Sequence, residues 1–302
     1  MMTVALRHSV HLALFAGLAS LSFATQGRAD EEESSLAGTR YASLSAEADD
    51  DSSHVLSAAL GLPLGQKGHL DLGAGRSRAT LDTIGEDSTF ASIDLGLDTK
   101  RTQMQIGYAY RDDGEGFRQH DFRGKFTLVR GIGKIGLDVF YRDAQDETVT
   151  SIQRRRRDSH SIRVLESIEG KGVGLHGNID VSDSVRLFAS GMVYDYDRDV
   201  DTPAFLARFP RFSLRVTGVT RDEAFLDNTA RAGVEYTLDL LTLAATYIHD
   251  EEIDTHDITH TGEVSADIPI GERWLLSPFV GYSSDDAEGG TAFAGMSVSV
   301  MW

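Results

Sequence analysis

Hydrophobic and polar residues alternate with a period of two along most of this sequence. Ala230, Ala232, Val234 and Tyr236 occupy every second position of one run, and charged or small residues stand between them. The segments 103–111 and 135–142 follow the same alternation. Successive side chains of a β-strand point to opposite faces, so this period predicts strands with one apolar and one polar face.

Segments of this kind recur as far as the last residue. We distinguish about fourteen of them, each roughly ten to twelve residues long. That length allows a tilted strand to cross the hydrocarbon core of a bilayer. A different assignment of the two longest connections would give about twelve or about sixteen strands. The segments begin near Leu36, Ser53, Gly68, Ser88, Arg101, Arg118, Gly133, Gly170, Ser184, Asn228, Leu240, Asp257, Arg273 and Thr291.

The connections between these segments alternate between short and long. Short connections occur at 62–67, 98–100, 131–133, 181–183, 239–240 and 269–272. Longer and more acidic ones occur at 47–52, 80–87, 112–116, 143–169, 195–227, 250–256 and 283–290. Within the connection 143–169, residues 148–153 can pair with 159–168 as a protruding hairpin. Short periplasmic turns and long external loops are typical of outer-membrane barrels.

The last segment carries a second signal. One of its faces is apolar throughout and ends in an aromatic residue: Ala292, Ala294, Met296, Val298, Val300 and Trp302. With the alternating loop lengths, this strand resembles the Gram-negative, porin-like outer-membrane β-barrel class, and no particular family within it. The resemblance implies an all-β fold, a closed antiparallel transmembrane barrel formed by residues 30–302. A soluble β-sandwich is the alternative, but it leaves the loop pattern and Trp302 unexplained.

In such a barrel the apolar face meets lipid and the polar face lines the lumen, because lipid offers no partners to backbone polar groups. Aromatic residues are expected to form girdles at the two membrane interfaces. We assign to the outward face, near strand ends, Tyr41, Tyr108, Tyr110, Tyr141, Tyr236, Tyr247, Trp274, Tyr282 and Trp302.

The first 29 residues differ from the rest. Arg7 and His8 precede an apolar run from Val10 to Ala24, and small residues around Arg28 offer a cleavage site. Residues 1–29 therefore read as a secretory signal peptide. Cysteine is absent from the sequence, which excludes disulfides, thiolate zinc sites and cysteine nucleophiles. We expect export through the periplasm to a bacterial outer membrane.

The net charge of the chain limits the kinds of partner that it is expected to bind. The chain holds 29 Lys and Arg against 47 Asp and Glu, a formal net charge of −18, which argues against binding of nucleic acid. The expected partners are outer-membrane lipid, lipopolysaccharide and small polar solutes. The pattern leaves a monomer and a homotrimer open.

The inward parity selects candidate pore-lining residues. The basic candidates, Arg111, Arg123, Lys125, Arg142 and Arg186, come from one set of strands. The acidic candidates, Asp71, Asp94, Glu263 and Asp267, come from another. Opposed arcs of charge would create a transverse field across a water-filled lumen. Alternatively, these charges pair across neighbouring strands and stabilise the wall, as Asp138 and Glu235 suggest locally.

The connection 195–227 is the candidate for a constriction. It interleaves aromatic and basic residues, and we single out Phe205, Arg208, Arg211 and Arg215. Such a mixture is unusual in a freely solvated loop, which favours folding into the lumen. The alternative is that residues 211–220 form a β-extension above the membrane.

Candidate chemistry is sparse. His249–Asp250 and His256–Asp257 could act as a hydrolase at the rim, but neighbouring residues of a strand point apart, so we expect no catalytic residue and no enzyme. We expect no cofactor and no dedicated metal site. Clustered carboxylates could hold divalent cations loosely at external loops. The weak candidates are Asp195, Asp197, Asp199, Asp250, Glu251 and Asp254.

These observations favour an outer-membrane porin-like channel for passive diffusion of small hydrophilic solutes or ions. A non-conducting structural or adhesive barrel that acts through acidic surface loops is the alternative, and a rim-located hydrolase is a third.

Overall fold

The computed structural model describes residues 40–302 apart from 51–52, 82–83, 115, 155–157, 198–213, 217–218, 222–224, 254–256 and 286–288. The predicted signal peptide, residues 1–29, lies outside the described residues. Among the residues that are described, none forms a helix long and apolar enough to cross a bilayer.

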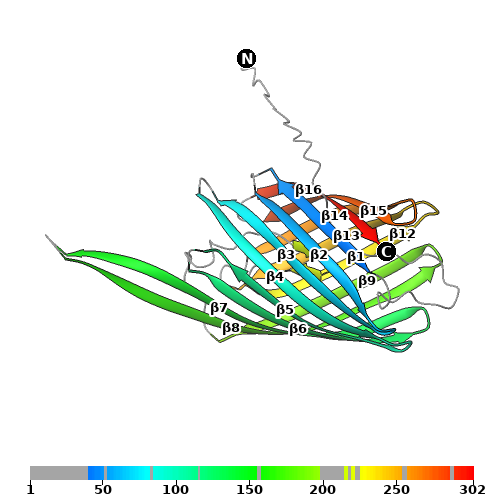
Figure 1. Ribbon diagram of the computed structural model, residues 1–302, viewed down its shortest axis with the longest axis horizontal. Coiled ribbons are helices and arrows are strands. Elements are labelled where there is room, and N and C mark those ends of the chain that lie inside the picture. Colours follow the sequence, from blue (N-terminus) through cyan, green and yellow to red (C-terminus); the bar gives the residue numbers. More distant parts are fainter. Residues whose placement is uncertain are drawn as a thin grey trace, which may run out of the picture.

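Fourteen strands close into one barrel, as the sequence predicts (Figure 1). They are β1 (Tyr41–Asp49), β2 (His54–Leu64), β3 (Gly68–Leu81), β4 (Ile84–Asp98), β5 (Thr102–Asp112), β6 (Arg118–Arg130), β7 (Gly133–Arg154), β8 (Asp158–Ser182), β9 (Val185–Tyr196), β12 (Leu226–Thr237), β13 (Thr242–Glu252), β14 (Ile258–Ile270), β15 (Trp274–Asp285) and β16 (Gly289–Met301). Two short strands, β10 (Leu214–Val216) and β11 (Val219–Arg221), pair with each other apart from the wall.

The wall has no free edge, because β1 also pairs antiparallel with β16, from Tyr41 opposite Met301 to Asp49 opposite Phe293. Elsewhere each strand pairs with its neighbours in sequence, except that β9 pairs with β12. Closure of this kind satisfies backbone hydrogen bonds inside a membrane, where open edges are not tolerated.

The outer face is apolar. Ile106, Val139 and Leu175 lie on neighbouring parts of the wall and are 64%, 49% and 62% exposed. The side chains that alternate with them point inward and are mostly polar, charged or glycine. An exposed apolar surface that surrounds the barrel identifies the wall as one that faces lipid.

The predicted aromatic positions are confirmed at most strand ends and wrong at one. Trp274, Tyr282 and Trp302 are exposed on the outer parity. Tyr41 instead points inward and is 3% exposed, and its hydroxyl donates a hydrogen bond of 2.6 Å to Asp71 Oδ1. Its register partner on β2 is Gly61, where a Cβ atom would collide with the Tyr41 ring. The missing side chain makes room for the ring inside.

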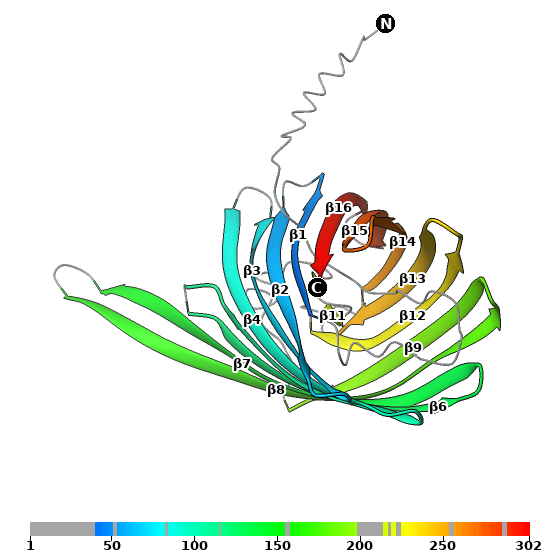
Figure 2. The same cartoon turned by 45° about the vertical axis from the view of Figure 1, so that its right-hand side comes forward.

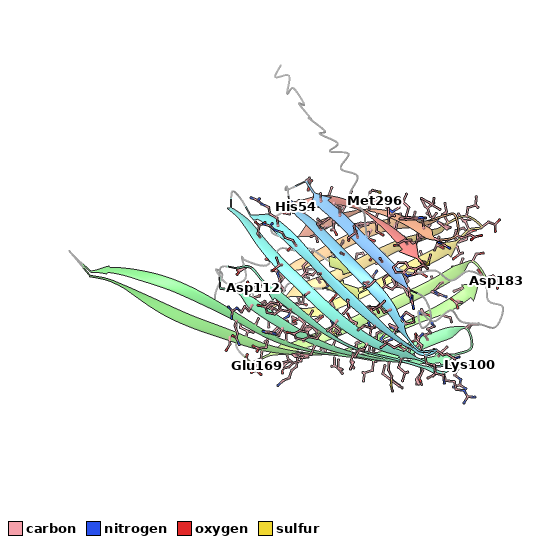
Figure 3. All side chains as sticks on the ribbon, viewed as in Figure 1. His54, Lys100, Asp112, Glu169, Asp183 and Met296 are labelled. Atoms are coloured by element: carbon pink, nitrogen blue, oxygen red, sulfur yellow. The ribbon has the colours of Figure 1, made fainter. Side chains whose placement is uncertain are left out.

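The two ends of the barrel differ. At the end that we call the turn end, tight turns contain Gly65, Gly131 and Gly271 with φ of 75°, 57° and 67°, values that glycine adopts without strain. Figure 3 places Lys100 and Asp183 at this end and Asp112 and Glu169 at the opposite end, the loop end. The β3–β4 connection at the loop end is shorter than predicted, because these strands continue to Leu81 and from Ile84.

Two strands greatly exceed the predicted ten to twelve residues. β7 has 22 residues and β8 has 25, and they continue past the rest of the wall as one hairpin (Figure 2). Thr148 pairs with Val164 and Gln153 with Ser159, so the predicted hairpin is confirmed. The length prediction was wrong because the hairpin continues the wall strands without a break and is not a separate element.

Candidate functional site: the barrel lumen

All the predicted pore-lining residues point into the barrel. The bases come from β5, β6, β7 and β9, and the acids from β3, β4 and β14. Each has the parity opposite to that of the outward apolar residues of its strand. Arg231 on β12 also points inward, where it faces Ser190 of β9. The inward Lys and Arg residues of the described strands thus lie on the arc from β5 through β9 to β12.

The remaining arc, from β13 through β16 and β1 to β4, is acidic and tightly packed. Among its described residues, no inward Lys or Arg occurs. Asp71, Asp94 and Glu263 are only 6%, 4% and 5% exposed. Small inward side chains fill the space around them, and the buried ones include Ser43, Ser57, Ser77, Ser88, Ser92, Ser277, Ser297 and Ser299.

Hydrogen bonds hold the acidic arc together. Asp71 accepts a bond from Tyr41 and lies 3.6 Å from His69 Nε2, while His69 Nδ1 lies 3.5 Å from Asp98. On β14, Asp267 accepts a hydrogen bond of 2.5 Å from the Ser277 hydroxyl. These carboxylates are engaged in the wall and offer little surface to a passing solute.

The basic arc also contains acids, so the predicted separation of charge is incomplete. Arg186 Nε lies 2.6 Å from Asp180, and Arg186 Nη1 lies 3.5 Å from Glu235. Asp138 lies 2.7 Å from His176 Nδ1, and His176 Nε2 lies 2.8 Å from the Thr127 hydroxyl. Cross-strand pairing, the alternative that the sequence left open, therefore accounts for Arg186.

Arg142 is enclosed. Its Nε and Nη2 atoms donate hydrogen bonds of 2.9 and 3.1 Å to the two oxygens of Asp121, and the residue is 2% exposed. The guanidinium also lies 5.1 Å from the centre of the Phe140 ring and 5.4 Å from that of Phe225. Phe225 packs with Phe117, Ala144 and Ile168 in a buried cluster near the loop end. Sequence reasoning missed this cluster, because its residues come from four separate segments.

A group of three cations remains more accessible. Lys125 is exposed although it points inward, and Arg123 and Arg231 are half-buried. Arg123 Nε and Nη2 are enclosed and have no hydrogen-bond acceptor in the described part of the chain. Lys125 and Arg231 interact electrostatically although β7, β8 and β9 separate their strands along the wall. We call Arg123, Lys125 and Arg231 the cation group.

Aromatic rings lie beside the cation group. Phe140 is the register partner of Arg123, and the Phe188 ring centre lies 5.5 Å from the Arg231 guanidinium. Phe140 and Tyr194 meet edge to face, with centres 5.5 Å apart. The Tyr194 ring lies against Gly172 of β8, where a side chain would collide with it. All three aromatic side chains are half-buried, so each presents part of its surface to the lumen.

The predicted constriction residues are only partly described. Phe205, Arg208 and Arg211 lie outside the described residues, and Arg215 is placed by its backbone in β10. β10 comes from the connection between β9 and β12, yet its Cα atoms lie within 8 Å of those of β2. β2 is on the far side of the barrel from β9 and β12, and Figure 2 draws β11 within the ring of strands. The hairpin therefore reaches from one side of the ring of strands to the other.

The rim candidates are dispersed. His249 and Asp250 point to opposite faces. The His249 ring centre lies 5.3 Å from that of His260, and Asp250 accepts a hydrogen bond of 2.5 Å from Thr229. Glu251 accepts a bond from Asn228 Nδ2. Asp197 accepts one from the Glu169 backbone N–H, and Asp195 faces Lys171 in the register. No group of three or more metal-binding side chains occurs among the described residues, and Asp199, Asp254 and His256 lie outside them.

Comparison with known proteins finds similar folds among solved structures only. No family model matches the sequence. The curated proteins contain no significant match. Among solved structures, a Pseudomonas aeruginosa FadL homologue has a TM-score of 0.54 at 10% identity, covering 88% of this chain and 91% of its own. The CymD monoaromatic hydrocarbon channel has a TM-score of 0.50 at 8% identity, covering 87% of each chain. The KdgM porin has a TM-score of 0.40 at 10% identity, covering 86% of this chain and 98% of its own.

The FadL homologue and CymD share the closed barrel of outer-membrane proteins with this chain. Together with the apolar outer face, the likeness identifies this chain as an outer-membrane β-barrel. At such low identity it shows the fold alone, so the activity is argued below from the lumen of this chain.

Proposed function

We propose that the barrel is a passive outer-membrane channel for small hydrophilic solutes, whose path follows the arc from β6 to β12. The observation that supports this proposal is the contrast in exposure inside the wall. Asp71, Asp94 and Glu263 of the opposite arc are almost completely buried, whereas Lys125 is exposed and its neighbours Arg123, Asp138 and Arg231 are half-buried. Water-accessible charge inside a closed wall is expected where solvent enters the lumen.

In this proposal the hairpin of β10 and β11 narrows the lumen. It lies near β2, on the acidic side, and so leaves the basic side as the wider part of the cross-section. Phe225 and its cluster fix the point at which the same connection re-enters the wall, since the Ile253 backbone N–H donates a hydrogen bond of 3.1 Å to the Phe225 carbonyl. Arg215 of β10 is retained as a constriction candidate.

Single-channel recording in a planar lipid bilayer tests the proposal. The folded full-length barrel is expected to insert in discrete steps of ohmic conductance. A matched measurement on a variant with bulk added to the arc, Gly172→Trp, should give smaller steps, because Gly172 lies on the inward face against Tyr194. Folded protein that never conducts would refute the proposal.

A structural or adhesive barrel is the second candidate, and the β7–β8 hairpin favours it. Beyond Gln145, the last partner of β6, and Gly170, the last partner of β9, the two strands continue together to Arg154 and Asp158. Replacing residues 146–166 by an Asn-Gly turn would remove this projection while keeping the wall. A channel keeps its conductance after this replacement, whereas an adhesin loses attachment of cells to a surface.

A further inference from the structure

We infer that the cation group and the aromatic rings beside it form a binding track for small organic carboxylates with a flat apolar body. The inference rests on the proposed channel and names its solute class. Its starting point is that the chain is strongly acidic overall, yet three cations gather on one part of the inner wall and one of them, Lys125, is exposed.

Arg123 supplies the first argument. Its Nε and Nη2 atoms are shielded from water and lack an acceptor among the described residues. Enclosed N–H donors without a partner are costly, and a guanidinium binds a carboxylate with two parallel hydrogen bonds. Arg142 lies on β7, two residues beyond Phe140, the register partner of Arg123. It shows the satisfied arrangement, because Asp121 accepts hydrogen bonds from two of its nitrogens. When the Arg123 side chain turns toward the lumen, a carboxylate solute would give it what Asp121 gives Arg142.

The distribution of charge around Arg123 supplies the second argument. Lys125 interacts electrostatically with Arg231 across the lumen, and Asp138, its register partner, is the carboxylate that interacts with Lys125. Asp138 is itself held by His176 at 2.7 Å. Among the inward acids of this arc, Asp121 and Asp180 lie against Arg142 and Arg186, and Glu235 interacts with both Arg186 and Arg231. The cation group thus keeps a local excess of positive charge, which attracts anions into a low-dielectric lumen.

The aromatic rings beside the cation group supply the third argument. Phe188 lies under the Arg231 guanidinium, and Phe140 is the register partner of Arg123, although the cation over the Phe140 ring is Arg142. Tyr194 extends the aromatic surface toward the loop end, against the glycine of β8. A hydrated inorganic anion would contact the cations alone. A solute that carries both a carboxylate and a flat ring would also pack against the exposed parts of the Phe140, Phe188 and Tyr194 rings.

Three probes separate these contributions in the reconstituted full-length channel: benzoate, acetate and benzyl alcohol. Each is added to one side in chloride solution, and its half-saturating concentration is read from the reduction of the chloride current. Benzoate is expected to bind about tenfold more tightly than acetate or benzyl alcohol, a factor that corresponds to one additional favourable contact. Equal values for benzoate and acetate would refute a role of the rings.

Variants test the residues. Arg123→Gln should weaken binding of benzoate and acetate alike, whereas Phe188→Leu should weaken benzoate only. Arg130→Gln is the matched control, because Arg130 lies on the same strand with outward parity at the turn end. If Arg123→Gln does not fold, Lys125→Gln serves, since its side chain is exposed. Unchanged benzoate binding in these lumen variants would overturn the inference.

The channel and the binding track fail in different ways. Conductance without preference for benzoate would overturn the inference and leave the channel intact. Equilibrium dialysis of benzoate against the folded protein measures binding without current. Saturable binding that Arg123→Gln abolishes, in a barrel that does not conduct, would support the track and refute the channel.

Discussion

The ion pair between Arg142 and Asp121 offers a sharp test of the lumen described above. Replacing Asp121 by Asn keeps its size and removes the negative charge that faces the Arg142 guanidinium. Arg142 is 2% exposed, so water cannot take the place of the lost partner. Removing one member of a buried pair leaves an uncompensated charge and costs about 3–5 kcal/mol. We therefore expect Asp121→Asn to lower the free energy of unfolding by that amount.

A second ion pair of the same barrel is the control. Arg76 Nη2 lies 2.6 Å from Asp87 near the loop end, with side chains 65% and 43% exposed. Exposed pairs contribute about 0–1 kcal/mol, so Asp87→Asn should change stability by no more than that. The double variant Asp121→Leu with Arg142→Met should recover most of the loss, because apolar replacement of both partners removes the stranded charge.

Reversible urea unfolding in phospholipid vesicles measures these differences. Trp274 and Trp302, the two tryptophans of the sequence, are both exposed on the outer face, so their fluorescence reports departure from lipid. The reasoning would be refuted by equal losses for Asp121→Asn and Asp87→Asn. It would also be refuted if the double variant were as unstable as Asp121→Asn alone, because the loss would then not arise from an unpaired charge.

Three further outcomes are expected. Val234→Arg, on the lipid face, should cost about 2–4 kcal/mol in the same urea titration and the inward Thr237→Arg much less, and equal costs would contradict the assigned faces. A cysteine at Asp50 should react with an impermeant maleimide on intact cells and one at Gln66 should not, whereas the reverse labelling would invert the proposed orientation. Phe225→Ala should increase current noise in single-channel recordings, because it removes the anchor of the connection that carries β10, and a trace as quiet as wild type would argue against that anchor.

The sequence was sufficient for the wall of the barrel. Alternation along each segment depends on local residues alone, and it correctly predicted fourteen strands and the inward direction of Arg123 and Asp94. Tyr41 was predicted wrongly because it was assigned by its aromatic type and its place at a strand end. The local alternation places it with Ser43, Ser45 and Glu47 on the inward face, and the absence of a side chain at Gly61 makes room for its ring.

The state of the lumen could not be predicted in the same way. Parity tells which side chains point inward, but not whether they are enclosed. Arg142 and Lys125 have the same parity and type of charge, yet Phe225 and Asp121 enclose the first and the second is exposed. That difference depends on contacts between β6, β7 and a connection more than eighty residues away from Arg142 along the chain. Only the three-dimensional arrangement brings them together.

The pairing of β1 with β16 has a consequence for how the protein is made. Tyr41 lies opposite Met301, so the first strand of the wall waits for almost the whole chain to be synthesised before its partner exists. Contacts between residues so distant in sequence form slowly, since the loop between them must be ordered first. During that delay, β1 and each newest strand present unpaired edges that invite pairing with other chains. The wall is therefore free of open edges only after β16 has paired with β1.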